Sequence, residues 1–262
     1  PFAGSALVIF LCVCGCTQHP GGNGIGEPVV SPGEIMKDGM SMLVYKANYL
    51  KLAADYTAYD TASEKMGKAA FLQAIASGEY LPLRLATTDS SIRYKLYHLT
   101  AAVPSDALST LRYYGDTYYK YYKREGERLP AINYTDVNGK LYNEAALSGK
   151  ILVLKCWFVH CAACVKEMPR LTRLQKEFGN RDDILFLSVA FDTREKLKAF
   201  LEKTAFNYAV IPVPESYIED TLQVHVYPTH FIVNKKGIIT KVTDNADDLE
   251  DALHSQLAKN EL

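Results

Sequence analysis

Hydrophobic and aromatic residues recur at helical spacing through the first half of the chain, from about residue 32 to residue 125. Residues three or four positions apart share one face of a helix, so this period predicts amphipathic helices. The expected helices cover 36–54, about 63–77, 89–99 and 104–122. Gly78 is expected to end the second helix and Pro104 to begin the fourth. Residues 32–125 are therefore predicted to form a small all-helical domain, and they contain no motif that indicates chemistry.

The pattern changes after Gly126, where short apolar runs replace the helical period. Residues 151–154 are all apolar, as expected of a buried central strand, and 184–190 predict a second buried strand. Hairpins are expected at Asn138-Gly139 and at 234–237. Helices are expected over 162–178, from Asp192 or Thr193 onward, and over 247–257. This order predicts a mixed sheet with helices on both faces.

An apolar segment, residues 6–14, stands near the start of the chain and is too short to span a bilayer comfortably. It leads into Val-Cys-Gly-Cys, ending at Cys16, which resembles the bacterial lipobox with its lipidated cysteine. The resemblance implies a signal peptide over 1–16 and a flexible tether over 17–31. Cys14 departs from the lipobox pattern, which usually has Ser, Ala or Thr there. The alternative is an uncleaved membrane-anchor helix, and either arrangement places the rest of the chain outside the cytoplasm.

Composition excludes some classes of function. The 262 residues are 48% hydrophobic and 23% charged, with a formal net charge of −1. Because no basic segment is clustered, nucleic acid is not expected as a partner. The six cysteines form two groups, three near the N-terminus and three at Cys156, Cys161 and Cys164. A small disulfide scaffold would distribute its cysteines through the domain.

Cys161 and Cys164 form a CxxC motif where the predicted strand gives way to the helix 162–178. The first turn of a helix presents unpaired N–H groups and the positive end of the helix dipole, which stabilise a thiolate. Cys161 is therefore expected to be the nucleophile, and Cys164, one turn further along, to close the disulfide. No further ligands stand at suitable spacing, so no metal is expected. No cofactor is expected beyond this redox-active disulfide.

Residues 126–262 resemble the TlpA/ResA-like thiol–disulfide oxidoreductases of the thioredoxin superfamily. The matching segments are Leu129-Pro130, the turn 135–140, Leu147-Ser148-Gly149-Lys150, Trp157 four residues before the first cysteine, the pattern CxxCxxExP from Cys161 to Pro169, and Val226-Tyr227-Pro228-Thr229. The resemblance implies a thioredoxin fold, a mixed central sheet flanked by helices, preceded by the helical domain.

The same resemblance implies roles for individual residues. Glu167 is expected to lie beneath the cysteine pair and to exchange a proton with Cys164, a task that a raised carboxyl pKa favours. The alternative is a solvated Glu on an amphipathic helix. Tyr227 and Pro228 are expected to form a cis-proline loop that pairs with an extended substrate beside Cys161, although an ordinary loop proline is the alternative.

Trp157 and His160 are the remaining expected substrate contacts, and His160 stands where the family usually has Trp. An exposed histidine without a role is the alternative there. The dipeptide between the cysteines, Ala162-Ala163, leaves the direction of the reaction open because this position helps to set the reduction potential. Cys156 is expected to be a buried strand residue that does not react.

The expected function is an extracytoplasmic thiol–disulfide oxidoreductase that reduces disulfides of exported proteins. A membrane electron donor would re-reduce it, and a lipid anchor would hold it in the bacterial cell envelope, facing the periplasm or exterior. One alternative is a thiol peroxidase of the peroxiredoxin type, although Phe158 stands where those enzymes usually carry Thr. The other is a non-enzymatic lipoprotein that binds a partner, with the dithiol as a redox-sensitive clasp.

Overall fold

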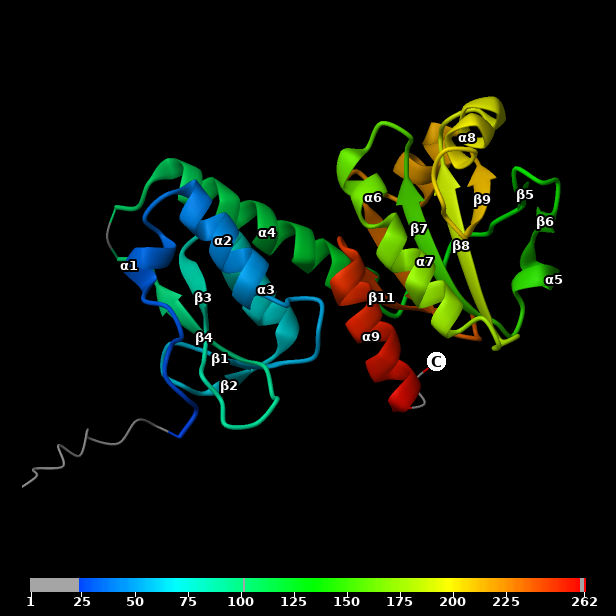
Figure 1. Cartoon of the computed structure of the whole chain (residues 1–262). Coiled ribbons are helices and arrows are strands. Elements are labelled where there is room, and N and C mark those ends of the chain that lie inside the picture. The colour runs from blue at the N-terminus through cyan, green and yellow to red at the C-terminus, as the bar shows by residue number, and fades with distance from the viewer. Residues whose placement is uncertain (1–23, 101, 260–261) are drawn as a thin grey trace, which may run out of the picture.

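The computed structural model describes residues 24–100, 102–259 and 262, which form two lobes (Figure 1). We call the described residues up to 124 the N-terminal lobe and those from 125 onward the C-terminal lobe. The predicted signal peptide, its Cys16 and the first part of the tether lie outside the described residues. In the part of the chain that is described, no helix has the length and apolar character needed to cross a bilayer.

The N-terminal lobe combines helices with a four-stranded sheet. Its elements are α1 (Pro32–Ile35), α2 (Gly39–Tyr49), β1 (Thr57–Tyr59), β2 (Lys65–Met66), α3 (Lys68–Ser77), β3 (Tyr80–Arg84), β4 (Arg93–His98) and α4 (Ser105–Arg124). The strands are ordered β2-β1-β4-β3. The predicted helical region is present, but the lobe is not all-helical.

The helix expected over 89–99 is strand β4 instead. Along this strand Tyr94 and Leu96 are buried, whereas Lys95 and Tyr97 are not, which is the two-residue alternation of a half-buried strand. Pairing with β3 and β1 satisfies the backbone of β4. Three apolar residues among 89–99 also fit a helical period. This period alone therefore did not distinguish a helix from a strand at these positions.

Two of the predicted helix ends are confirmed. Helix α3 ends at Gly78, whose left-handed φ of 76° is readily adopted by glycine. Helix α4 begins directly after Pro104. The helix expected over 36–54 is shorter than predicted, because Asp38 caps α2 by accepting a bond from the N–H of Ser41 at 2.7 Å, and the helix ends at Tyr49.

The C-terminal lobe is built on a five-stranded sheet of order β11-β10-β7-β8-β9. Strands β7, β8 and β9 are parallel, and β10 is antiparallel to β7 and β11. The elements are β5 (Tyr134–Thr135), β6 (Leu141–Tyr142), α5 (Glu144–Leu147), β7 (Ile151–Trp157), α6 (Ala162–Lys166), α7 (Met168–Glu177), β8 (Ile184–Ala190), α8 (Arg194–Leu201), β9 (Ala209–Pro212), the π-helix η1 (Tyr217–Thr221), β10 (Thr229–Val233), β11 (Ile239–Thr243) and α9 (Ala246–Ala258).

Most of the predicted pattern of this lobe is confirmed, including both hairpins and the central strand. Strand β9 was not predicted. The helix expected over 162–178 is two helices, α6 and α7, which meet at Glu167. Pro169 explains the break, because it lacks an N–H and is tolerated only in the first turn of α7.

The two faces of β7 lie in different cores. Its odd-numbered residues, including Val153 and Trp157, pack with residues of α6, α7, α8 and α9. Its even-numbered residues, including Leu154 and Cys156, pack with residues of β6, η1 and β11. This alternation decides which side chains of β7 lie beneath the CxxC motif.

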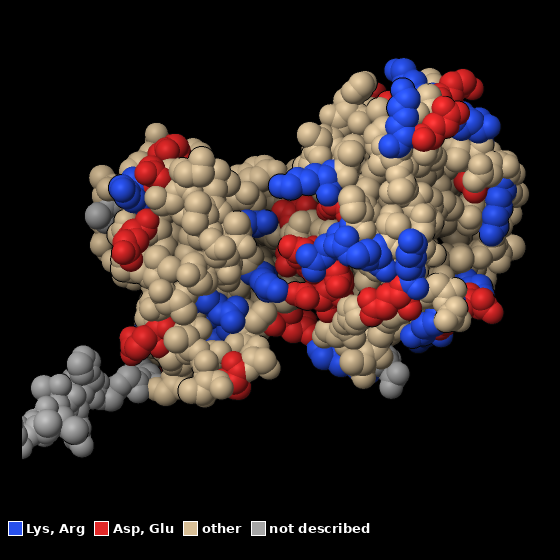
Figure 2. All heavy atoms as spheres, viewed as in Figure 1, with Lys and Arg blue, Asp and Glu red and all other residues tan. Residues whose placement is uncertain are grey.

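Helix α4 extends from the N-terminal lobe to β11 of the C-terminal lobe (Figure 1). Charged side chains gather along the boundary between the lobes, where both signs lie side by side (Figure 2). Ion pairs across this boundary join Lys46 with Asp244 at 3.7 Å, Lys51 with Asp251 at 2.6 Å and Asp55 with Lys259 at 2.5 Å.

Candidate active site

The CxxC motif lies at the end of the central strand. Strand β7 ends at Trp157, and Cys161 is the N-cap residue of α6, with its sulfur accepting a bond from the N–H of Cys164 at 3.2 Å. The two cysteines are joined by a disulfide. Cys161 is 7% exposed and Cys164 is fully buried. An incoming group therefore reaches Cys161 first, which agrees with its expected role as the nucleophile.

Three aromatic rings pack together beyond the carboxyl ends of β7 and β8. Phe158 follows β7, Phe191 follows β8, and Tyr227 lies before β10. The ring of Phe158 is 5.2 Å from that of Phe191 and 5.4 Å from that of Tyr227. All three are partly exposed. We did not predict Phe158 or Phe191 as site residues, although the carboxyl ends of neighbouring parallel strands meet at one edge of a sheet.

The Tyr227–Pro228 peptide bond is cis. The loop is fixed by Thr229, whose Oγ1 donates to the carbonyl of Val226 at 2.6 Å. From the N-terminal lobe, Tyr121 on α4 places its hydroxyl 3.1 Å from the same Oγ1. A cavity of about 550 Å³ lies beside this loop and is lined by residues of both α4 and the segment 223–226. Tyr227 also packs against the core cluster that holds both cysteines.

Two predicted substrate contacts have different outcomes. Trp157 is fully buried, and its ring centroid lies 5.3 Å from that of Phe200 and 6.0 Å from that of Phe206. The prediction that it contacts substrate is therefore wrong, because it packs within the core instead. His160 is exposed and stands immediately before Cys161, so its role stays a prediction.

Glu167 is the focus of a buried group of charged side chains. Lys155 Nζ donates a hydrogen bond to Glu167 Oε1, and His230 Nε2 lies 2.9 Å from the same oxygen. The side chains of Lys155 and His230 are fully buried, and that of Glu167 is 12% exposed. The alternative of a solvated Glu therefore does not hold.

The pKa of the Glu167 carboxyl is not raised, although a raised pKa would favour the expected proton exchange with Cys164. Burial raises the pKa of Glu167, but His230 and Lys155 lower it by more, so it lies below its ordinary value. Burial also lowers the pKa of both Lys155 and His230, because it disfavours their charged forms. The carboxyl is thus held in its ionised form.

Lys155 and His230 were missed in the sequence. Strands β7 and β10 pair Lys155 with His230 directly, although 74 residues separate them. One signal was visible, since Lys155 interrupts an otherwise apolar strand, and a buried ammonium requires a partner. Cys156, its neighbour, faces the opposite core and is fully buried, and burial raises the pKa of its thiol. This agrees with the expectation of an unreactive residue.

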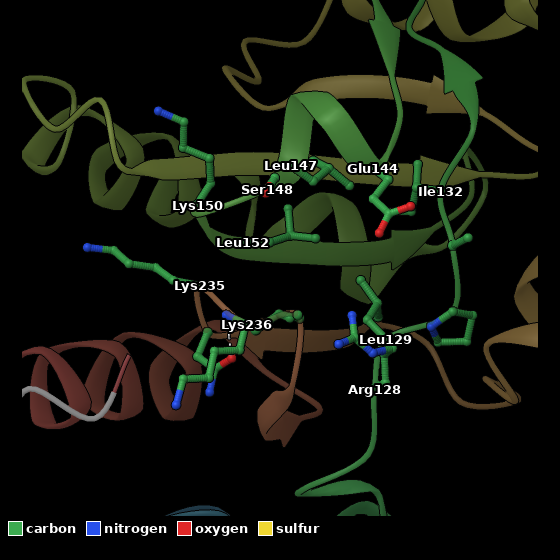
Figure 3. A pocket seen from close by; sticks show the side chains of 15 residues that line it. Arg128, Leu129, Ile132, Glu144, Leu147, Ser148, Lys150, Leu152, Lys235 and Lys236 are labelled. Carbon is green, nitrogen blue, oxygen red and sulfur yellow. Dashed lines mark hydrogen bonds between the residues drawn. The ribbon is translucent and has the colours of Figure 1, made fainter.

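Other possible sites are remote from the disulfide. A cavity of about 350 Å³ lies at the opposite end of β7, lined by Arg128, Leu152 and several lysines (Figure 3). Two of these lysines bind the segment 182–183, Lys150 through the carbonyl of Asp182 and Lys235 through the carboxylate of Asp183. On the outer surface of α7 and α9, Glu177, Glu250 and His254 place ligand atoms within 4.8 Å of one another. Exposed acidic groups often cluster in this way, and we assign no metal to them.

Comparison with known proteins gives the family. The AhpC/TSA family model matches residues 126–242. The thioredoxin-like protein YneN of Bacillus subtilis is 27% identical over 123 residues, 45% of this chain and 71% of that protein. The thiol-disulfide oxidoreductase ResA of Bacillus subtilis is 28% identical over 119 residues, 45% of this chain and 66% of that protein. The chain from residue 126 onward is a TlpA/ResA-like domain of the thioredoxin superfamily.

A solved structure is similar to part of this chain. A thiol:disulfide interchange protein from Bacteroides sp. is 24% identical with a TM-score of 0.45, and the match covers 50% of this chain and 88% of that chain. The matched residues of the family model leave out the N-terminal lobe. With a CxxC disulfide at the end of the central strand and relatives of this class, the chain is a thiol–disulfide oxidoreductase.

Proposed function

We propose that this chain acts outside the cytoplasm and reduces disulfides of exported proteins through Cys161 and Cys164. The observation that carries the proposal is the disulfide at the N-cap of α6, with the cis-proline loop packed against the same cluster. The more exposed cysteine is available to a polypeptide, and the second is sheltered behind it. Export is supported by the apolar segment and the lipobox resemblance at Cys16.

The reaction needs two sulfur transfers. The thiolate of Cys161 attacks one sulfur of the client disulfide, which breaks that bond and releases one client thiolate. Cys164 then loses its proton and attacks the sulfur of Cys161, which closes the Cys161–Cys164 disulfide and releases the second client thiolate. Two electrons pass from the protein to the client, so a membrane electron donor must reduce the protein before the next cycle.

Residues around the disulfide have separate roles in this proposal. The partly exposed rings of Phe158, Phe191 and Tyr227 form an apolar surface on which an extended client segment packs. Backbone groups of the Tyr227–Pro228 loop pair with that segment. Glu167, by resemblance to the family, accepts the proton that Cys164 loses.

The test is the reduction potential of the Cys161–Cys164 couple, measured against glutathione or dithiothreitol buffers in a Cys156→Ala background. A potential near −270 mV, roughly that of thioredoxin, supports a reductase fed by a membrane donor. A potential near about −120 mV would mean an oxidant and would overturn the proposed direction. Rapid consumption of added hydroperoxide would instead favour the peroxidase.

A further inference from the structure

We infer that Lys155 and His230 are positioning residues that hold Glu167 by one carboxylate oxygen and leave the other for the thiol of Cys164. The inference rests on the proposed function and explains how the second sulfur transfer obtains its base. Neither Lys155 nor His230 belongs to a sequence motif described above for this domain.

The contacts on the carboxylate of Glu167 are asymmetric. Lys155 Nζ and His230 Nε2 both meet Oε1. Among the described residues, no side chain or backbone group bonds to Oε2. One oxygen is therefore held by the hydrogen bond from Lys155 and lies against the His230 ring, while the other keeps its full capacity to accept a proton.

Lys155 and His230 are neighbours across β7 and β10, and both lie on the sheet face that carries Trp157. Cys164 is fully buried in the core on this same face. Glu167 follows Cys164 by three residues, at the end of α6, so the two side chains lie on one side of the helix. The groups that hold the carboxylate and the sheltered cysteine thus lie on the same face of the sheet.

Other titratable side chains lie around Glu167, Lys155 and His230. From the segment before β9, Tyr208 interacts with Glu167, and burial raises the pKa of its hydroxyl, so it stays protonated. From beyond β11, Asp244 acts on His230. On α7, Arg170 is turned to α9, where it pairs with Asp247 and Glu250. Lys155 is accordingly the cation that directly balances Glu167.

The consequence is a base that stays ionised while Cys164 is a thiol. In the mixed disulfide, the proton of Cys164 passes to Oε2 of Glu167, and the resulting thiolate attacks the sulfur of Cys161 and releases the client thiolate. The proton then leaves Glu167 to the client thiolate or to water. Removing Lys155 or His230 destabilises the ionised form of the Glu167 carboxyl, and its titration therefore moves to higher pH.

The experiment follows the second transfer by itself. The full chain is used with Cys12, Cys14 and Cys16 replaced by Ser and Cys156 by Ala, then reduced and mixed with one equivalent of Ellman's reagent. Attack by Cys161 releases one thionitrobenzoate, and attack by Cys164 releases the second, so the two phases report the two steps. The rate of the second phase is recorded against pH.

Lys155→Met and His230→Leu are expected to shift the midpoint of this pH profile upward. For Lys155→Met the expected shift is about one pH unit, which makes the second phase roughly fivefold slower at the parent midpoint and about tenfold slower well below it. His230→Gln, which restores a donor, should recover part of the shift. Lys241→Met is the matched control, since Lys241 is a buried lysine of the same sheet that pairs with Glu125 and not with Glu167.

The outcomes are distinct. Unchanged midpoints in both Lys155→Met and His230→Leu would overturn the inference, even if their stability fell. A shift of equal size in Lys241→Met would also overturn it, because the effect would then be general. If Lys155→Met does not fold, His230→Leu and its Gln rescue decide the question. Failure of the proposed function looks different, because the reduction potential of the parent protein would then be that of an oxidant, whatever the pH profile of the second phase.

Discussion

Charged side chains occupy two contrasting regions of this molecule, the interior beneath the disulfide and the boundary between the lobes. Lys155 and Glu167 in the interior are 0% and 12% exposed, whereas Lys51 and Asp251 at the boundary are 47% and 52% exposed. An exposed pair contributes about 0–1 kcal/mol, while breaking a buried pair costs about 3–5 kcal/mol because one charge stays buried alone. Burial, and not the number of ion pairs, therefore decides where charge matters in this fold.

The largest expected effect concerns the disulfide itself. Cys161→Ser should lower the rate of client reduction by on the order of 10⁴-fold or more, because the nucleophile is lost. Cys164→Ser should keep the first attack and accumulate a mixed disulfide, since no thiol remains to resolve it. Non-reducing electrophoresis with a disulfide-bonded peptide measures both. Continued turnover in Cys161→Ser would show that neither this disulfide nor the charged group beneath it takes part in the reaction.

The second effect concerns the stability of the interior region. Lys155→Met leaves the carboxylate of Glu167 without its cation and should lower the free energy of unfolding by about 3–5 kcal/mol. Urea unfolding followed by the fluorescence of Trp157, the single tryptophan, measures this change.

The double variant Lys155→Met/Glu167→Met is the control for that measurement. It removes both charges together, so it should regain much of the loss. A double variant as unstable as the single one would show that packing, and not the unpaired charge, causes the loss.

Much of this interior region follows from the sequence, but its partners do not. The strand, the CxxC and Glu167 lie within 17 consecutive residues, so local periodicity and spacing located them. His230 is brought to Lys155 only by pairing of β7 with β10, which no local pattern specifies. The same limit applies to β4, which pairs with β1 from more than 30 residues away. Local patterns thus predicted elements better than they predicted neighbours.

The third effect is the dependence of stability on pH. Burial lowers the pKa of His230 in the folded chain. Below about pH 6.5 the imidazole therefore binds a proton in the unfolded chain but not in the folded chain. The pKa of Glu167 is also lowered when folded, so its contribution is present above 4.5 and is lost as pH falls through its folded value. In both cases the unfolded state binds more protons. The free energy of unfolding should therefore fall on acidification.

Each of these groups contributes a slope of at most about 1.4 kcal/mol per pH unit. His230→Leu should remove the part of the decline that begins near pH 6.5 and also reduce the part that begins near 4.5, because His230 helps to lower the pKa of Glu167. Urea unfolding between pH 7.5 and 4 tests this. A decline that begins at the same pH in His230→Leu would assign it to other groups.

The smallest effect is expected at the boundary between the lobes. Lys51→Ala removes an exposed partner of Asp251 and should change the free energy of unfolding by no more than about 1 kcal/mol. That small change should shrink in 1 M salt, where the screening length falls to about 3 Å, whereas the effect of Lys155→Met should persist because its pair is buried. Urea unfolding at 0.1 and 1 M salt compares the two variants directly. A loss of several kcal/mol in Lys51→Ala would contradict the difference between the two regions, and so would an equal effect of salt on both variants. In either case the exposure of an ion pair would not determine how much it contributes to the stability of this fold.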